Sequence, residues 1–417
     1  MSEHFQCSGA PQPAKRRITT KSLRRATRLT ALVIFMSLLL AAKETSLPLF
    51  APALSPLVAI ASIITTRTFV GIHLLGLFVL GIAAWRRRWF CHWVCPTGLC
   101  ADQASAQGRR MKRRGPRLPA MGPGIAIFIL ASACVGYPLF LWLDPLALLG
   151  AAVTPLTTPH HPSAWLFSAG ILAVLILSFV WPNIWCGQLC PLGGLQEVTY
   201  RIRRLIVRAA SPDAKQNRQL STKKPLVVER RTLFAVVAGL GWGVVARTVC
   251  GRGSTPVRPP GSVDASRFSA LCIRCGNCVR SCPTHVITHE WGEHGLAGLM
   301  TPKMDFRDDY CFESCNACTA VCPSGAIQPI SIDEKIHAKM GIAVVNMEIC
   351  LLGDDRECAI CRNRCPYGAI SLDFDDELYT LTPRVDLSRC PGCGACETAC
   401  PTQPVKAILV RSCQWSR

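Results

Sequence analysis

The stretch CIRCGNCVRSCP, from Cys272 to Pro283, decides the fold of the last third of this 417-residue chain. Its spacing, C-x2-C-x2-C-x3-C-P, is an iron-sulfur ligation pattern, in which three thiolates of a short loop bind one cubane and the fourth binds the neighbouring one. The spacing returns in CPGCGACETACP, from Cys390 to Pro401, and two divergent sets lie between. Four sets predict four 4Fe-4S clusters, and their ligands are Cys272, Cys275, Cys278, Cys282, Cys311, Cys315, Cys318, Cys322, Cys350, Cys358, Cys361, Cys365, Cys390, Cys393, Cys396 and Cys400.

Zinc ribbons and a disulfide-rich secreted domain are the alternatives for so many cysteines. Zinc sites come as separated C-x2-C pairs, and a disulfide scaffold does not repeat Cys-Pro at a fixed offset. The intervals between sets, 29, 28 and 25 residues, suit paired ferredoxin modules of short hairpins and helices. Residues 250–417 are therefore predicted to form an α+β ferredoxin-like domain. The shared spacing of sets one and four hints at pairing 1/4 and 2/3, although sequential pairing fits almost as well.

Charge divides the chain into two parts. Residues 1–249 carry 29 Lys and Arg against 7 Asp and Glu, whereas residues 250–417 carry 17 against 19, which together give the formal net charge of +20. In the first part the basic residues stand in short clusters between apolar runs, as the positive-inside rule requires of cytoplasmic loops. This distribution indicates contact with a lipid bilayer and gives no support to nucleic-acid binding.

Four apolar runs predict an α-helical membrane bundle, residues 26–210, after a cytoplasmic basic N-terminus, residues 1–25. The first run is expected to be an anchor rather than a signal peptide, because no convincing small-residue cleavage site follows it. The three-proline stretch Leu47–Thr66 is expected to be a broken re-entrant or interfacial segment. Both hairpin returns then lie on the cytoplasmic side. The predicted spans are Ala26–Ala42, Phe69–Trp85, Met121–Leu143 and Ala164–Trp181.

A fifth apolar run, Leu233–Val249, follows a basic cytoplasmic linker, residues 211–232, and is expected to be a transmembrane tether. Arg230 and Arg231 stand directly before it, an arrangement similar to a twin-arginine export signal. Export after folding suits a cysteine-rich domain, since clusters are assembled in the reducing cytosol. An ordinary fifth helix is the alternative and gives the same topology. The expected location is the bacterial inner membrane, multi-pass, with the cluster domain in the periplasm.

Each predicted cytoplasmic return carries a C-x3-C-P motif, with Cys91 and Cys95 in one and Cys186 and Cys190 in the other. Residues four apart share a helix face, and a motif repeated at equivalent points of two hairpins would bring four thiolates together. Four thiolates suit an iron-sulfur cluster, zinc or a redox dithiol. Inert cysteines are the alternative, but chance duplication of both the spacing and the proline is improbable. The motifs predict a further iron-sulfur or metal site at the cytoplasmic edge.

Residues 1–210 resemble the membrane subunit of the periplasmic nitrate reductase quinol dehydrogenase, and are similar to its methylamine-utilisation relative. Residues 225–417 resemble the companion ferredoxin subunit, so the chain looks like a fusion of the two. Beside the motifs above, the resemblance rests on the corner Trp142-Leu143-Asp144-Pro145 and on the long gap from Cys350 to Cys358. Set two departs from the regular spacing, because three residues separate Cys311 from Cys315.

The resemblance implies oxidation of membrane quinol and delivery of the electrons through four 4Fe-4S clusters to a periplasmic reductase or cytochrome. The alternative is a maturation or reactivation factor that donates electrons to a periplasmic metalloenzyme without sustaining its turnover. Both functions use the same row of clusters. Neighbouring genes would separate them, since a catalytic reductase favours respiration and assembly factors favour maturation.

Quinol oxidation also releases protons, which need an acceptor near the head group. The candidate residues for quinol and proton handling are His73, inside the second span, and Asp144, at the expected outer corner. Asp102 or Glu197, which stand beside the cysteine pairs, are further candidates. Instead of handling protons, Asp144 could serve as a helix cap or turn residue. Glu197 could likewise be the i,i+4 surface partner of Arg201.

The sequence contains no binding motif for c-type haem or for a dinucleotide cofactor. The sequence has no C-x-x-C-H for c-type haem, and the glycines from Gly239 to Gly243 lack the preceding strand of a dinucleotide site. With the inner cysteines at one membrane edge and the cluster domain outside, electrons would have to cross roughly 30 Å of hydrocarbon. A bound quinone or a further carrier would then be needed. The remaining cysteines are expected to be non-ligands: Cys7, Cys100, Cys134, Cys250 and Cys413.

Overall fold

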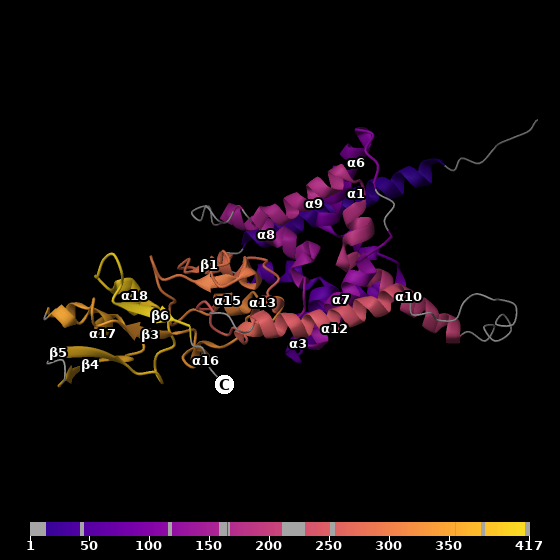
Figure 1. Ribbon diagram of the computed structural model, residues 1–417. Helices are drawn as coiled ribbons and strands as arrows, with labels where there is room; N and C mark the ends of the chain where they lie inside the picture. Colours follow the sequence, from indigo (N-terminus) through magenta and orange to yellow (C-terminus); the bar gives the residue numbers. More distant parts are fainter. Residues whose placement is uncertain are drawn as a thin grey trace, which may run out of the picture.

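The structure is a computed structural model that describes residues 14–41, 46–115, 119–157, 165, 167–210, 230–250, 255–354, 356–376 and 380–412. A helical bundle forms one end of the elongated molecule, and a small α+β domain, called the outer domain below (residues 255–412), forms the other (Figure 1). The predicted N-terminus up to residue 13 and the linker 211–229 lie outside the described residues.

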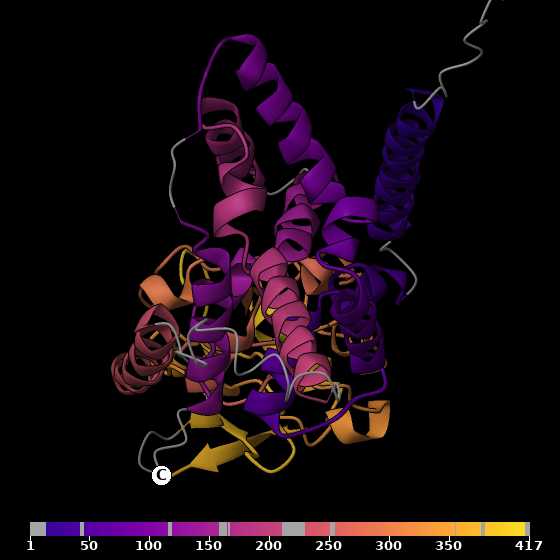
Figure 2. The same cartoon turned by 90° about the vertical axis from the view of Figure 1, so that its right-hand side faces the viewer.

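The bundle contains all the helices up to residue 250, and many of them are short. Figure 2 shows them from the side, with the strands of the outer domain behind. Their bounds are α1 (Ala14–Leu40), η2 (Leu47–Leu49), α2 (Phe50–Ala53), α3 (Pro56–Thr66), α4 (His73–Trp85), α5 (Trp89–Trp93), α6 (Pro96–Arg110), α7 (Gly122–Cys134), η3 (Leu141–Leu143), α8 (Pro145–Thr157), α9 (Ser168–Val180), η5 (Trp185–Leu189), α10 (Pro191–Ala210) and α12 (Arg230–Cys250).

The helices only partly match the predicted spans. One helix of the described chain, Arg230–Val249, is long and apolar enough to cross a membrane, and the pair Leu47–Ala53 and Pro56–Thr66, bent by 94°, would make a second if it is one span. The bend lies in the stretch where a break was expected. The other apolar helices α4, α7, α8 and α9 have 13 residues each. Thirteen residues reach about 20 Å, short of a hydrocarbon core of about 30 Å.

The expected end of the third span is wrong. It ends at Cys134 rather than Leu143, because Gly136 takes a φ of +84° and turns the chain. A further buried helix, α8, which was not expected from the sequence, begins at Pro145. Proline is favoured at the first helical position, where its missing N–H costs nothing, and a preceding aspartate can cap the helix.

The predicted tether α12 packs along α7 at glycines spaced four apart. A Cβ atom at Gly239 would lie 2.6 Å from the carbonyl oxygen of Phe128, and one at Gly243 would lie 3.3 Å from Ser132. Small residues at this spacing let two helix backbones approach closely. Packing between helices therefore explains these glycines.

Among its described residues, the outer domain has three two-stranded antiparallel sheets. Strand β1 pairs with β2, β3 with β6, and β4 with β5. Ile370 opens β4 directly after the third Cys-Pro, and Ser262 forms an isolated bridge with Ile327 after the second, which agrees with the expected returns to a sheet. The elements are α13 (Ala265–Leu271), α14 (Asn277–Arg280), β1 (Ile287–His289), η6 (Leu296–Gly298), β2 (Pro302–Met304), α15 (Ala317–Ala320), α16 (Ile332–Lys335), β3 (Ile342–Val345), η7 (Leu351–Asp354), α17 (Ile360–Arg364), β4 (Ile370–Asp375), β5 (Thr380–Val385), α18 (Ala395–Ala399) and β6 (Ile408–Arg411).

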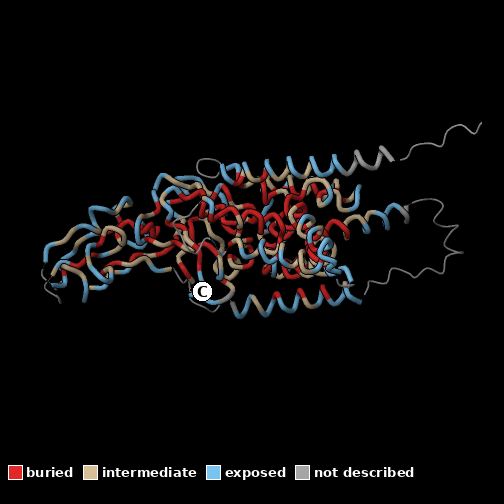
Figure 3. Tube along the Cα trace, turned by 90° about the horizontal axis from the view of Figure 1, so that it is seen from above, coloured by how far each residue is buried: buried red, intermediate tan, exposed pale blue. Residues whose placement is uncertain are grey.

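Buried residues concentrate where the bundle meets the outer domain, whereas the long helices at the two edges are largely exposed (Figure 3). The main hydrophobic cluster crosses this boundary. It joins Leu57 and Leu146 of the bundle to Ile273 and Cys275 of the outer domain. The two parts therefore share one core.

Candidate iron-sulfur sites

Four small cavities in the outer domain are each lined by four cysteines. Three come from one set, and the fourth is the last cysteine of the neighbouring set. Site I is Cys272, Cys275, Cys278 and Cys322; site II is Cys311, Cys315, Cys318 and Cys282; site III is Cys350, Cys358, Cys361 and Cys400; site IV is Cys390, Cys393, Cys396 and Cys365. Sets one and two thus exchange their fourth cysteines, as do sets three and four. The hint of a 1/4 and 2/3 pairing is wrong.

The local backbone explains how a short loop surrounds each cavity. In site I, Gly276 precedes the short helix α14 with a φ of +73°, and in site IV Gly394 precedes α18 with a φ of +85°. Only glycine adopts such angles without steric cost. The turn places the second and third cysteines of the set on either side of it. The proline after the fourth cysteine disfavours a helical conformation at that cysteine, and Cys400 is extended, with a φ of −62° and a ψ of 127°.

The sulfur atoms have the surroundings that an iron-sulfur cluster requires. Backbone N–H groups of Ile327 and Ala369 donate to Cys322 and Cys365 over 3.4 and 3.3 Å. Hydrogen bonds of this kind tune cluster potentials. In the described chain no three Cys, His, Asp or Glu side chains converge closely enough to hold a single metal ion, whereas a cubane spreads its four thiolates around four irons.

Burial makes some of these thiols weaker acids. It raises the pKa of the Cys275 thiol to about 12, and that of Cys393 to about 12 as well. When a cluster binds, iron therefore has to displace a tightly held proton from each of these two thiols.

The four sites lie in the order I, II, IV, III. Sites I and II are joined by the exchange of Cys282 and Cys322. The Cys311 N–H of site II donates to the Cys393 carbonyl of site IV over 2.9 Å. Cysteines of sites III and IV share one hydrophobic cluster, which includes Cys361. Site III lies near α17, at the end of the molecule farthest from the bundle (Figure 1).

The bundle holds a fifth cysteine site, called the inner cavity. Cys91, Cys95, Cys186 and Cys190 line a space of about 360 Å³. Two copies of one arrangement build it: α4, α5 and α6 carry the first pair, and α9, η5 and α10 carry the second. Cys95 and Cys190 directly precede α6 and α10, and their sulfurs accept N–H groups of Gly98 and Gly193 over 3.3 and 3.5 Å.

Further donors suit an anionic group in this cavity. The Gln196 amide donates to the Cys91 sulfur over 3.4 Å. The buried Trp185 indole N–H lines the cavity and has no hydrogen-bond partner among the described residues. Arg28 and Arg88 also line it. Four cysteines, N–H donors and cations fit an iron-sulfur cluster, whose thiolate-ligated core carries negative charge.

Site I packs directly on the bundle. Ser62 of α3 donates to the Ser324 carbonyl over 2.8 Å, and Asn277 donates to the Pro48 carbonyl over 3.0 Å. The approach is close, because a Cβ atom at Gly150 would lie 3.3 Å from the Cys275 carbonyl oxygen. Sites II to IV lie farther along the outer domain.

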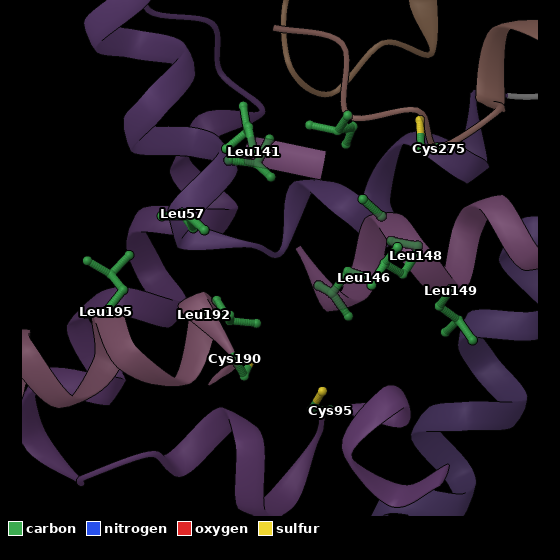
Figure 4. Packing of buried hydrophobic residues seen from close by; sticks show 14 of the residues in the cluster. Leu57, Cys95, Leu141, Leu146, Leu148, Leu149, Cys190, Leu192, Leu195 and Cys275 are labelled. Atoms are coloured by element: carbon green, nitrogen blue, oxygen red, sulfur yellow. The ribbon is translucent and has the colours of Figure 1, made fainter. Parts of the chain in front are cut away.

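Helix α8 connects the inner cavity to site I. Pro145, at its start, lines the inner cavity, and Gly150 contacts Cys275. These two residues are about 8 Å apart along a helix. In Figure 4, Leu146 and Leu148 lie between Cys95 and Cys190 on one side and Cys275 on the other. The path along α8 is shorter than the roughly 30 Å expected from the sequence, because the corner before Pro145 folds into the bundle, where Asp144 is fully buried.

The predicted proton-handling residues are scattered. Fully buried Asp144 caps α8, accepting the N–H groups of residues 146 and 147, and accepts the Ser55 hydroxyl. His73 is buried at the start of α4 and accepts the Val70 N–H over 3.3 Å. Glu197 pairs with Arg87 and, four residues on, with Arg201. Of the four candidates, only Asp102 lines the inner cavity, paired with Arg28 over 2.6 Å.

Sequence reasoning missed the other residues around the inner cavity. His92 and Trp185 line it, and Gln196 reaches a cysteine sulfur. His92 lies inside one C-x3-C motif and Trp185 directly precedes the other, so adjacency to the motifs was a usable signal. Arg28 comes from the first helix and could not be found that way.

Two families match the chain over its cysteine sites. A 4Fe-4S dicluster domain matches residues 271–326 and 356–403, which contain sets one and two and most of sets three and four. A 4Fe-4S binding domain matches residues 66–114 and 163–209, and each stretch contains one C-x3-C-P motif. The bundle is therefore similar to iron-sulfur proteins too.

Several curated relatives are similar to less than half of the chain. The methylamine utilization ferredoxin-type protein MauM of Methylobacillus flagellatus is 35% identical over 201 residues, 44% of this chain and 84% of the relative. The ferredoxin-type protein NapG of Escherichia coli is 36% identical over 205 residues, 45% of this chain and 87% of the relative. The ferredoxin-type protein NapF of Escherichia coli is 27% identical over 157 residues, 37% of this chain and 87% of the relative. No solved structure matches.

Proposed function

We propose a function from the premise that this chain belongs to the ferredoxin-type family of MauM and NapG. As a member it is an iron-sulfur electron-transfer protein. The proposal is that its bundle oxidises membrane quinol, as in the membrane subunit it resembles, and that four 4Fe-4S clusters carry the electrons to a periplasmic reductase or cytochrome. The chain would then unite membrane and ferredoxin subunits in one polypeptide.

One observation carries this proposal: the four outer sites form a row that begins on the bundle beside the inner cavity. Each 4Fe-4S cluster, when bound, accepts and releases one electron. The chain's own residues fix where this happens. Cys275 lies against helix α8, and α17, which carries Cys361, lies toward the end of the molecule away from the bundle (Figure 1). A row with one end in the bundle and the other exposed suits conduction from a membrane donor to a soluble acceptor.

Exposed apolar side chains support a membrane location for the bundle. Phe78 of α4, Ile176 of α9 and Trp242 of α12 are 68%, 55% and 62% exposed. In water, such large apolar surfaces would be unfavourable, and in a bilayer they face lipid.

The direct test is reduction of the purified full chain by a quinol analogue under anaerobic conditions, followed by electron paramagnetic resonance (EPR). We expect signals of reduced 4Fe-4S clusters with the quinol and none with the corresponding quinone. Dithionite provides the reference for complete reduction. The quinol dehydrogenase function would be refuted if dithionite reduces the clusters but quinol analogues of both low and high potential fail to reduce them.

The topology makes a separate prediction. The arginine clusters at residues 86–88 and 201–208 favour a cytoplasmic location for both segments, and a membrane-spanning α12 would then put the outer domain in the periplasm. Reporter fusions after residues 208 and 417 should therefore report opposite compartments. If both fusions report the cytoplasm, α12 does not carry the outer domain across the membrane, and a cytosolic electron acceptor is favoured instead.

A further inference from the structure

Arg280 is a buried cation at the contact between site I and the bundle. It is 3% exposed and stands between the third and fourth cysteines of set one. Its Nη1 donates to the Gly150 carbonyl over 2.6 Å and to the Thr154 hydroxyl over 2.9 Å, both on α8. The same nitrogen donates to the Cys275 carbonyl over 3.3 Å. One guanidinium thus holds the site I loop and helix α8 together.

These partners leave the charge of Arg280 uncompensated. Gly150, Thr154, Cys275 and Asn277 all offer neutral oxygen atoms. A buried guanidinium without a negative counterpart is unfavourable, because it has lost its hydration without gaining a counter-charge. The negative groups at hand are the thiolates of Cys275 and Cys278 once a cluster is bound. The cation and the cluster therefore stabilise each other.

The other cysteine sets lack this residue. At the position two after the third cysteine, set one has Arg280, whereas the other sets have Ala320, Asn363 and Thr398. Site II has a buried cation of a different kind, because Lys335 donates to the carbonyls of Phe312 and Cys315. Those partners belong to the outer domain alone.

We propose that Arg280 couples site I to helix α8 and makes site I the first acceptor of electrons from the bundle. As a positioning residue it fixes the site I loop on α8, and its charge raises the reduction potential at site I by favouring the more negative reduced state. This inference rests on the proposed function. Quinol would become quinone by losing two electrons and releasing two protons to water. Cys91, Cys95, Cys186 and Cys190 would hold the group that passes these electrons one at a time to site I.

The test compares R280M with the matched variant K335M in the purified full chain. EPR-monitored redox titration reports the potentials, and hydrogen exchange of residues 145–157 reports contact with α8. R280M should lower the potential of one cluster and accelerate exchange in α8. K335M should also lower the potential of one cluster, but hydrogen exchange in α8 should stay at the parental rate. Unchanged potentials and unchanged exchange in R280M would overturn the proposal.

The conservative variant R280K separates charge from contact. It should keep the potential near the parental value, because the charge remains, and still accelerate exchange in α8, because lysine lacks the planar guanidinium fork. R280K also keeps the test decisive if R280M binds too little iron. If hydrogen exchange of α8 in R280K stays at the parental rate, the proposed coupling of site I to α8 is refuted. The redox titration and the hydrogen-exchange measurement do not use quinol. A failure of the proposed function would therefore appear in a separate experiment, in which quinol does not reduce the parental protein.

Discussion

Replacing Cys91 and Cys186 together with serine should abolish reduction of the outer clusters by quinol, while dithionite still reduces them all. The two residues line the inner cavity from its two equivalent halves, so the double variant removes one cysteine from each pair. The outer sites contain none of these cysteines and should assemble normally. The measurement is the EPR signal of the full chain after anaerobic addition of a quinol analogue.

The chain offers a matched control for this variant. Cys100 and Cys134 belong to the bundle but are not among the residues that line the inner cavity. C100S with C134S should be reduced by quinol at the parental rate. If the C91S and C186S double variant is also reduced at that rate, the inner cysteines are structural, and quinol delivers electrons to site I directly.

Replacing Cys322 with serine should remove the cluster of site I, although Cys322 belongs to the second cysteine set. The exchange of fourth cysteines predicts this, because Cys322 lines the cavity of Cys272, Cys275 and Cys278. Iron in the outer domain should fall from about sixteen to about twelve atoms, four per cluster. Quinol should then reduce none of the remaining outer clusters, since the first acceptor is lost, whereas dithionite should reduce all of them.

Two further single variants make the C322S result specific. C275S, which affects site I alone, should give the same EPR spectrum as C322S. C400S should lose site III at the far end, with the same loss of iron but with quinol reduction of the other clusters preserved. A C322S spectrum that matches that of C315S, in site II, would show that each set keeps its own fourth cysteine.

Much of the chemistry could be read from the chain because ligand spacing is local. A C-x2-C-x2-C turn such as Cys272–Cys278 can wrap only a small inorganic group, and the repeated C-x3-C-P motif by itself indicates a second cysteine site in the bundle. The break in Leu47–Thr66 was likewise predictable, since prolines remove helix hydrogen bonds within a few residues.

The bundle was harder to predict because apolar composition does not fix helix length. The run from Met121 reads as one span to Leu143, yet the glycine at 136 ends the regular structure after Cys134. Asp144 illustrates the same difficulty. Its carboxylate caps a buried helix, whereas the sequence is equally compatible with a cap and with a proton acceptor at this position.

The sequence by itself determined which cysteines gather, that they suit iron-sulfur clusters, and that a basic, apolar half precedes an acidic, cysteine-rich one. Only the tertiary structure decided which fourth cysteine serves which site, that α8 joins the inner cavity to site I, and that Arg280 lies between them. The physical reason is the range of the interactions. Loop geometry and ligand chemistry act over a few residues, whereas the contact of Arg280 with Gly150 spans 130 positions of the chain and exists only after the two halves pack together.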